Sequence, residues 1–410
     1  MNIVDGEPQS DLVPDVGSPL TLVAIQLPRA LLEGKWKEGA LGACEELVKC
    51  LATVTDIDVL ADRDNPKLAQ DWVTRVAPKG RFAMIPATDE KLNAIWIRDP
   101  FLCKERGNHR TYVKTGSHPQ EARQADWLAA VDGSTIASLK VVLDGGDCLV
   151  GQDYWLAGVQ AVHETVRINK ITYLDACMAI SKIDRRRLHI AGYRARDLKS
   201  RLYWILVEAR KRAKKYLAVQ PLQAWTDTNI ISPYIRIILE MIYILRHPEE
   251  LLQPWAHIDL VLALTGIKDE TTGKPIVLVA NPTLAPSCPV DGAAHTQNDP
   301  LDALEVYLKE IGYCVRRNPA PFSGPKGDAR RLFPYNNVIV SNDPDIVWLP
   351  QFALADGTFA DADAANVEIW RQLGFKVIPV PGWCAFLLSD GAIRCATKTL
   401  VRGAATQKSD

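Results

Sequence analysis

The sequence predicts a mixed α/β fold, because short apolar segments rich in β-branched residues alternate with longer segments of helical spacing. The short segments are typical of strands buried on at least one face, and they are residues 20–25, 136–143, 258–264, 276–280, 337–340 and 375–380. Helical patterns lie between several of them, as at 43–52 and 364–373. Turn-forming Gly, Pro and Asp residues separate these units, which favours a modular assembly of sheets.

One stretch differs in kind from the rest. Between residues 165 and 217, fifteen Lys or Arg residues stand against four Asp or Glu, and helical spacing dominates. Together with the apolar segment that follows, it predicts a helical insertion at 167–248, which divides the chain into parts at 1–166 and 249–410. The basic residues form either the solvated face of a helical bundle or a surface for an acidic partner, nucleic acid included.

Composition sets broad limits on what the protein binds. The formal net charge of the 410 residues is −1, so the average charge favours neither nucleic acid nor a membrane. The most apolar segment, 230–245, contains Pro233, Arg236 and Glu240, and it predicts a buried helix rather than a membrane span. The nine cysteines include no Cys-x-x-Cys pair, and the N-terminus lacks the layout of a signal peptide. We therefore expect no disulfide framework, no metal and a reducing, cytoplasmic location.

Four segments carry a polar or ionisable group at the end of an apolar run, where a strand would deliver it to a cleft: 96–101, 143–147, 257–259 and 394–395. Asp99 follows such a run, and the alternative to a site there is an ion pair with Arg98. Asp144 precedes two glycines, which indicates either an ordinary turn or a close approach of the backbone to a site.

His257 and Asp259 are two residues apart, so on a strand both side chains point to the same face. This arrangement suits an imidazole and a carboxylate that address one ligand, although a histidine satisfied at the start of a strand is the alternative. Cys395 has a polar context led by Gly391, unlike the other eight cysteines, which fit small buried hydrophobic residues. A reactive thiol needs a nearby cation, and either Arg394 or a cationic substrate could supply it.

Taken together, these segments resemble the guanidino-group-modifying enzyme superfamily of pentein fold. That family includes arginine deiminase, agmatine deiminase, dimethylarginine dimethylaminohydrolase and the amidinotransferases. Its order of motifs is an Arg-Asp segment, an acidic residue before Gly-Gly, a His-x-Asp, an Asn-bearing strand and a C-terminal Cys. The chain shows the same order, with Arg98-Asp99, Asp144, His257 with Asp259, Asn337 and Cys395. The resemblance implies five ββαβ-type modules around a central site, with the helical segment inserted among them.

The resemblance also implies roles for these residues. Asp99 and Asp259 hold the guanidinium nitrogens of a small substrate, and Asp144 orients His257. Cys395 attacks the central carbon, and His257 protonates the departing amine to leave a covalent S-alkylthiouronium, without a metal or other cofactor. Arg98, Asn337 and Arg394 are placed with the substrate-binding residues.

The chain departs from the family pattern at three places. Asp144 stands where deiminases usually carry Glu, and Ala392 replaces a common Gly, whereas Arg394 before the cysteine resembles arginine deiminases. The segment between Asp147 and His257 is longer than the usual connection. In arginine deiminases this region supplies an arginine for the substrate carboxylate, and Arg167 is the candidate here.

We expect a cysteine hydrolase of a guanidine or amidine, with a guanidino compound of arginine metabolism as its small-molecule partner. An amidinotransferase, in which a second amine takes the carbon, is the alternative enzyme. A catalytically silent binding protein whose basic insertion contacts an acidic partner is the alternative outside enzymes, but it has no chemical need for Cys395, His257, Asp259 and Asp99 together. The insertion could otherwise cap the site or form a homo-oligomer interface.

Overall fold

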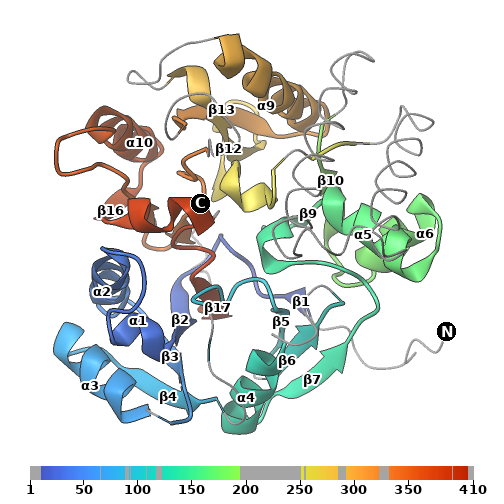
Figure 1. Ribbon diagram of the computed structural model, residues 1–410. Coiled ribbons are helices and arrows are strands. Elements are labelled where there is room, and N and C mark those ends of the chain that lie inside the picture. Colours follow the sequence, from blue (N-terminus) through green and yellow to red (C-terminus); the bar gives the residue numbers. More distant parts are fainter. Residues whose placement is uncertain are drawn as a thin grey trace, which may run out of the picture.

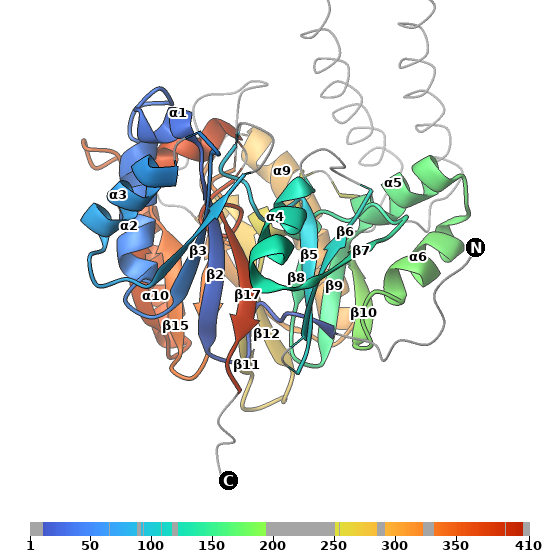
Figure 2. The ribbon, with the colours of Figure 1, turned by 90° about the horizontal axis from the view of Figure 1, so that it is seen from below.

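A computed structural model of the chain describes residues 11–64, 66–87, 92, 94–107, 109–116, 122–193, 251–253, 255–284, 292–322, 332–389 and 391–404. Structural statements below concern these residues. Five small sheets stand around a common axis with helices on the outside of the ring, as Figure 1 shows along the axis and Figure 2 from the side.

The five sheets have strand orders β17-β2-β3-β4, β1-β5-β6-β7, β8-β9-β10, β11-β12-β13 and β14-β15-β16. The strands of the first two sheets are β1 (Asp11–Leu12), β2 (Leu20–Leu27), β3 (Asp56–Ala61), β4 (Phe82–Pro86), β5 (Phe101–Arg106), β6 (His109–Lys114), β7 (Thr135–Ser138) and β17 (Thr397–Arg402). Those of the other three are β8 (Cys148–Val150), β9 (Tyr154–Gly158), β10 (Arg187–Ala191), β11 (Leu262–Lys268), β12 (Pro275–Asn281), β13 (Cys314–Pro319), β14 (Ile339–Ser341), β15 (Ile346–Pro350) and β16 (Lys376–Val380).

Each sheet is built on the same ββαβ plan. A first strand (β5, β8, β11, β14 or β17) pairs antiparallel with a second, and a helical crossover returns the chain to a third strand that is parallel to the second. The helices are α1 (Arg29–Leu32), α2 (Ala40–Leu51), α3 (Pro66–Val76), α4 (Arg123–Asp132), α5 (Val159–Asn169), α6 (Tyr173–Ser181), α9 (Gly292–Glu310) and α10 (Ala360–Gln372). Crossover helices cover the outer faces, so the second strands are buried on both sides, as along β12 and β15.

The last strand of the chain closes the ring. β17 pairs antiparallel with β2, and Thr397 lies opposite Ile25 in the register. The first module therefore takes its first strand from the C-terminal end and its second strand from the N-terminal end (Figure 1). Residues nearly 400 positions apart in the sequence meet at the axis as a result.

Most of the expected elements are present. The runs at 20–25, 276–280 and 375–380 lie in β2, β12 and β16, and the expected helices lie in α2 and α10. Three expected strands are wrong in part. Only 136–138 of the run at 136–143 is a strand, 258–260 forms a 3₁₀ turn (Ile258–Leu260) before β11 begins, and 337–338 precede β14. The errors have one cause, because apolar residues can be buried in irregular segments without strand pairing.

The predicted insertion begins within α5 and is only partly described. Residues 187–191 form β10, which pairs parallel with β9 and completes the third sheet, so this module extends beyond the expected boundary at 166. The remainder of the expected helical segment, including the apolar run at 230–245 and most of the basic stretch, lies outside the described residues. None of the helices in the described part of the chain combines the length and the apolar character that crossing a bilayer demands.

Candidate active site

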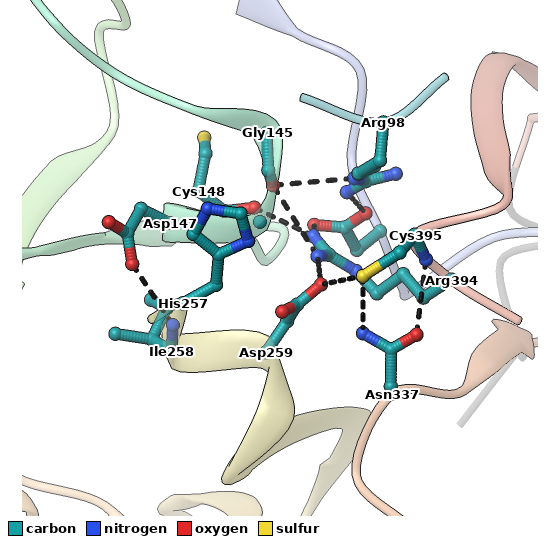
Figure 3. Close-up of polar contacts among 12 residues, drawn as sticks. Arg98, Gly145, Asp147, Cys148, His257, Ile258, Asp259, Asn337, Arg394 and Cys395 are labelled. Carbon is teal, nitrogen blue, oxygen red and sulfur yellow. Dashed lines mark hydrogen bonds and ion pairs between the residues drawn. The ribbon is translucent and has the colours of Figure 1, made fainter. Parts of the chain in front are cut away.

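The polar residues singled out in the sequence meet at one end of the ring axis. Each belongs to a segment that leads into the first strand of a module. These segments place Asp99 before β5, Asp144 before β8, His257 before β11, Asn337 before β14 and Cys395 before β17. The N-terminal ends of five first strands therefore converge on one site, and Figure 3 shows His257, Asp259, Asn337 and Cys395 within it.

Cys395 lies in a tight turn just before β17, and its thiol is held by Asn337. Asn337 Nδ2 lies 3.0 Å from Cys395 Sγ, and Asn337 Oδ1 accepts from the backbone N–H of Cys395 at 3.1 Å and of Ala392 at 3.2 Å (Figure 3). The backbone N–H of Arg98 donates to Cys395 O at 3.2 Å. One amide side chain thus fixes both the turn and the sulfur, and the Arg98 contact ties the turn to the segment that carries Asp99.

His257 lies between two carboxylates at the open side of the site. Its Nε2 is 3.3 Å from Asp144 Oδ2, and its Nδ1 is 3.8 Å from Asp99 Oδ1. Burial alone lowers the pKa of His257, but the charge of Asp99 and hydrogen bonds to Asp144 and to Cys395 raise it well above its ordinary value. The imidazole is therefore protonated at neutral pH and is ready to act as a general acid.

A third acidic residue, Asp147, holds the segment that carries His257. Its Oδ1 accepts from the backbone N–H of Ile258 at 3.0 Å and from Gln253 Nε2 at 2.8 Å. Burial raises the pKa of Asp147 to about 7, against the opposing effect of the nearby imidazolium. This carboxyl group holds the backbone directly after His257 and the side chain of Gln253 before it, and no contact with the thiol is present among the described residues.

The two glycines after Asp144 are required by close packing. A Cβ atom on Gly146 would lie 2.3 Å from His257 Nδ1, and one on Gly145 would lie 1.9 Å from the carbonyl oxygen of Arg98. The N–H of Gly146 donates to Asp99 Oδ1 at 2.8 Å. The Gly-Gly pair is therefore a close approach of the backbone to a site, and it helps to orient the carboxylate of Asp99.

Asp259 is the most deeply buried acid of the site, with a fully enclosed side chain. Its Oδ2 accepts from Arg394 Nη1 at 2.6 Å and lies 3.6 Å from Cys395 Sγ, whereas its Oδ1 has no hydrogen-bond partner among the described residues (Figure 3). Burial raises its pKa, in opposition to the charges of Arg394 and His257. A buried carboxylate oxygen without a donor can accept from a ligand N–H beside the sulfur.

The thiol of Cys395 is not ionised in the unliganded protein. Burial and the negative charge of Asp259 raise its pKa to about 11, although the interaction with His257 acts in the opposite direction. A cation bound between Asp99 and Asp259 would offset both of these causes and would favour the thiolate. The site as a whole is therefore suited to a positively charged ligand.

No protein-family model and no curated protein matches the sequence. Among solved structures, the agmatine deiminase of C. jejuni matches with a TM-score of 0.62 at 13% sequence identity, covering 98% of this chain and 99% of that one. A Cys-to-Ser variant of the C. jejuni enzyme with substrate bound gives 0.63 at 13% identity, with the same coverage. A protein of Porphyromonas gingivalis assigned as an arginine deiminase gives 0.58 at 14% identity, covering 94% and 97%.

The chain has the pentein fold. The predicted pentein fold is therefore confirmed. At these identities the likeness concerns the fold alone, so the chemistry has to be argued from the residues in place.

Each of the three arginines expected at the substrate pairs with a carboxylate of the protein. Arg98 and Arg394 point below the site, where both pair with the carboxylate of Asp15, and their side chains are almost fully buried. Arg167 lies on α5 at the rim of the ring and pairs with Glu164 (Figure 1). Their carboxylate partners give Arg98 and Arg394 supporting positions, whereas Arg167 is separated from the site by its place in the last turn of α5.

Sequence reasoning missed two buried groups beneath the site. Asp15 stands in an acidic N-terminal segment that has the composition of an exposed tail, and nothing in its pattern marks it as buried. Lys398 lies on β17 and donates to Arg98 O at 2.9 Å and to Phe101 O, and burial lowers its pKa to about 7. Its position three residues after Cys395 was the only available signal, since a lysine on a terminal strand is usually exposed.

Proposed function

We propose that this pentein is a cysteine-dependent hydrolase of deiminase type, which cleaves a C–N bond in the guanidine or amidine group of an arginine-related small molecule. The observation that carries the proposal is the convergence of a thiol, a protonated imidazole and three carboxylates on one point of the ring axis. A guanidinium is planar and permanently charged, and it offers N–H groups that carboxylates match in geometry and charge. The fold shared with deiminases supports the same conclusion.

In this proposal, Asp99 and the unpartnered Oδ1 of Asp259 accept from the guanidinium nitrogens of the substrate. The bound cation lowers the pKa of Cys395, so the thiol releases its proton to solvent when the substrate arrives and the thiolate nucleophile forms. The thiolate then adds to the central carbon, while Asn337 Nδ2 remains a hydrogen-bond donor to the sulfur.

His257 then transfers the proton. As an imidazolium it protonates the departing amine, the C–N bond breaks, and an S-alkylthiouronium remains on Cys395. The neutral imidazole next takes a proton from a water molecule that attacks the same carbon, and the C–S bond breaks to release a ureido product. Asp144 keeps the ring of His257 oriented throughout, since it contacts Nε2.

The test is incubation of the protein with arginine, agmatine, methylated arginines and guanidino acids, following ureido product and released amine. We expect turnover of at least one compound, its loss in Cys395→Ala, and its retention in Cys384→Ala, which removes a partly exposed cysteine of the fifth module. Full activity of Cys395→Ala, or no turnover in the whole panel, would contradict the proposal. Product formation that requires an added amine acceptor would indicate amidino transfer instead.

A further inference from the structure

Two of the site segments are joined from below by one carboxylate that comes from the start of the chain. Asp15 Oδ1 pairs with Arg98 Nη2, and Asp15 Oδ2 lies 3.1 Å from Arg394 Nη2. Arg98 immediately precedes Asp99, and Arg394 immediately precedes Cys395. Asp15 therefore connects the neighbours of a guanidinium-binding acid and of the nucleophile.

Asp15 is itself built firmly into the axis. Its Oδ2 accepts from the backbone N–H of Val150 at 2.8 Å, and its own N–H donates to Val150 O at 2.7 Å. Only 10% of its side chain is exposed. Burial opposes its ionisation, but the charges of Arg394 and Arg98 hold its pKa well below the ordinary value. Asp15 is therefore an anion at any pH at which the protein works.

Oppositely charged groups alternate along this line. Arg394 is shared between two carboxylates, with Nη1 on Asp259 at 2.6 Å and Nη2 on Asp15 at 3.1 Å. With both carboxylates ionised, the four groups Asp15, Arg98, Arg394 and Asp259 carry two negative and two positive charges. Two further basic residues lie beside them: Lys398 donates to Arg98 O, and Arg402 donates to Asp15 O. At low effective dielectric constant such a group is sensitive to the loss of any one charge.

We propose that Asp15 is a positioning residue that sets the charge beneath the nucleophile, by neutralising Arg98 and Arg394 so that Asp259 keeps its negative charge available for a guanidinium. The consequence for the sulfur follows from its contact with Asp259, since Cys395 Sγ lies 3.6 Å from Asp259 Oδ2. If Asp15 loses its charge, the group gains one net positive charge, which favours the thiolate and disfavours a cationic ligand.

The role in ligand binding rests on the proposed function, whereas the effect on the thiol does not. The primary measurement is therefore the rate of alkylation of Cys395 by iodoacetamide as a function of pH, read by mass spectrometry of the peptide that contains it. In Asp15→Asn we expect the thiol pKa to fall by about one unit, which makes alkylation at pH 8 about tenfold faster. In Arg98→Met the net charge changes in the opposite direction, and alkylation should become slower.

A double variant and a control separate charge from packing. Asp15→Asn with Arg98→Met restores balance, and its alkylation profile should return to that of the unaltered protein. Asp184→Asn serves as the control, because Asp184 is also a buried carboxylate paired with an arginine, Arg186, and it also accepts a backbone N–H from the N-terminal segment, that of Leu12. It contacts neither Arg98 nor Arg394 in the described structure, so it should leave the Cys395 profile unchanged.

The outcomes are distinct. If Asp15 has only a structural role, Asp15→Asn should lower the thermal stability and leave the thiol pKa unchanged, and this result would overturn the proposal. A shift of the alkylation rate in the same direction in Arg98→Met and Asp15→Asn would also overturn it. If Asp15→Asn does not fold, the slower alkylation of Arg98→Met and its reversal in the double variant decide the question. Where a guanidino substrate is turned over, Asp15→Asn should raise its KM about tenfold. A shifted thiol without any turnover supports the role of Asp15 and contradicts the proposed function alone.

Discussion

The contact between Asn337 and Cys395 can be tested by replacing a single nitrogen atom with oxygen. Asn337→Asp keeps the size of the side chain and an oxygen that can accept from the N–H groups of Cys395 and Ala392. It replaces the Nδ2 donor, 3.0 Å from Cys395 Sγ, by an anionic oxygen. The variant therefore preserves the turn and reverses the electrostatic effect on the sulfur.

The magnitude follows from the distance. A unit negative charge 3.0 Å from a thiolate costs about 5 kcal/mol at an effective dielectric constant of about 20. One pKa unit corresponds to about 1.4 kcal/mol, so the upper limit is a rise of about 4 units above a thiol pKa that already lies at about 11. Even if relaxation removes half of this effect, alkylation of Cys395 at pH 8 should fall by about 100-fold. Turnover of any substrate should be lost with it.

The adjacent residue offers a matched control. Asn336 is as buried as Asn337, but its Nδ2 donates to Val261 O and it has no described contact with Cys395. Asn336→Asp thus introduces a buried charge one residue away and should leave the alkylation profile of Cys395 close to that of the unaltered protein. An unchanged profile in Asn337→Asp, with a normal thermal melt, would refute the idea that this amide controls the sulfur. Equal losses in both variants would attribute the effect to buried charge in general.

Two further predictions concern the groups around His257. Gly146→Ala should abolish turnover, because its Cβ would lie 2.3 Å from His257 Nδ1, and an active variant would contradict this packing. As a control, Gly42→Ala lies in α2 with open space around it and should raise the free energy of unfolding by about 0.5–1 kcal/mol in denaturant titrations. Asp147 keeps its proton up to about pH 7 when folded and loses it near pH 4 when unfolded, so its contribution to stability is complete below pH 4 and is lost as the pH rises through 7. Asp147→Asn keeps an oxygen that accepts from both Gln253 and Ile258. It should raise the free energy of unfolding at pH 8 by up to about 4 kcal/mol, and this gain should vanish near pH 4. A gain that does not depend on pH would exclude the explanation.

The sequence was sufficient to predict that the side chains of Asp99, Asp144, His257, Asp259 and Cys395 lie near one another. It was not sufficient to predict that they precede the first strands of the modules and do not follow strands. Asp99, Asp144 and Cys395 were expected to follow apolar runs that end at a cleft, yet each lies in an irregular segment before a first strand. The same apolar residues pack at the ring centre without regular pairing, and hydrophobicity alone does not distinguish the two cases. His257 and Asp259 were expected on one face of a strand, whereas Asp259 lies in a 3₁₀ turn and reaches the site from there.

The ion pairs beneath the site could not be predicted for a different reason. Asp15 and Arg394 are 379 residues apart, and local patterns contain no information on such a contact. A buried charge is stable only with its partner, so Asp15, Arg98 and Arg394 each have the composition of an exposed residue when considered alone. The motifs therefore predicted which residues cluster at the candidate site, whereas Arg98 and Arg394 were assigned to the substrate because their partner in the N-terminal segment has no motif.

Ring closure then links folding to chemistry in this protein. Asp15 enters the axis just before β2, and Cys395 with Arg394 just before β17, the two strands that pair to close the ring. Arg394 has its partner Asp15 only when these distant segments have met, and the turn that holds Cys395 also takes the N–H of Arg98 and the carboxamide of Asn337 from two other modules. Contacts of such large sequence separation form late because the chain entropy must be lost first. A buried thiol partnered by Asn337 and Asp259 is thus a property of the closed ring, and the unclosed chain presents Cys395 as an ordinary cysteine.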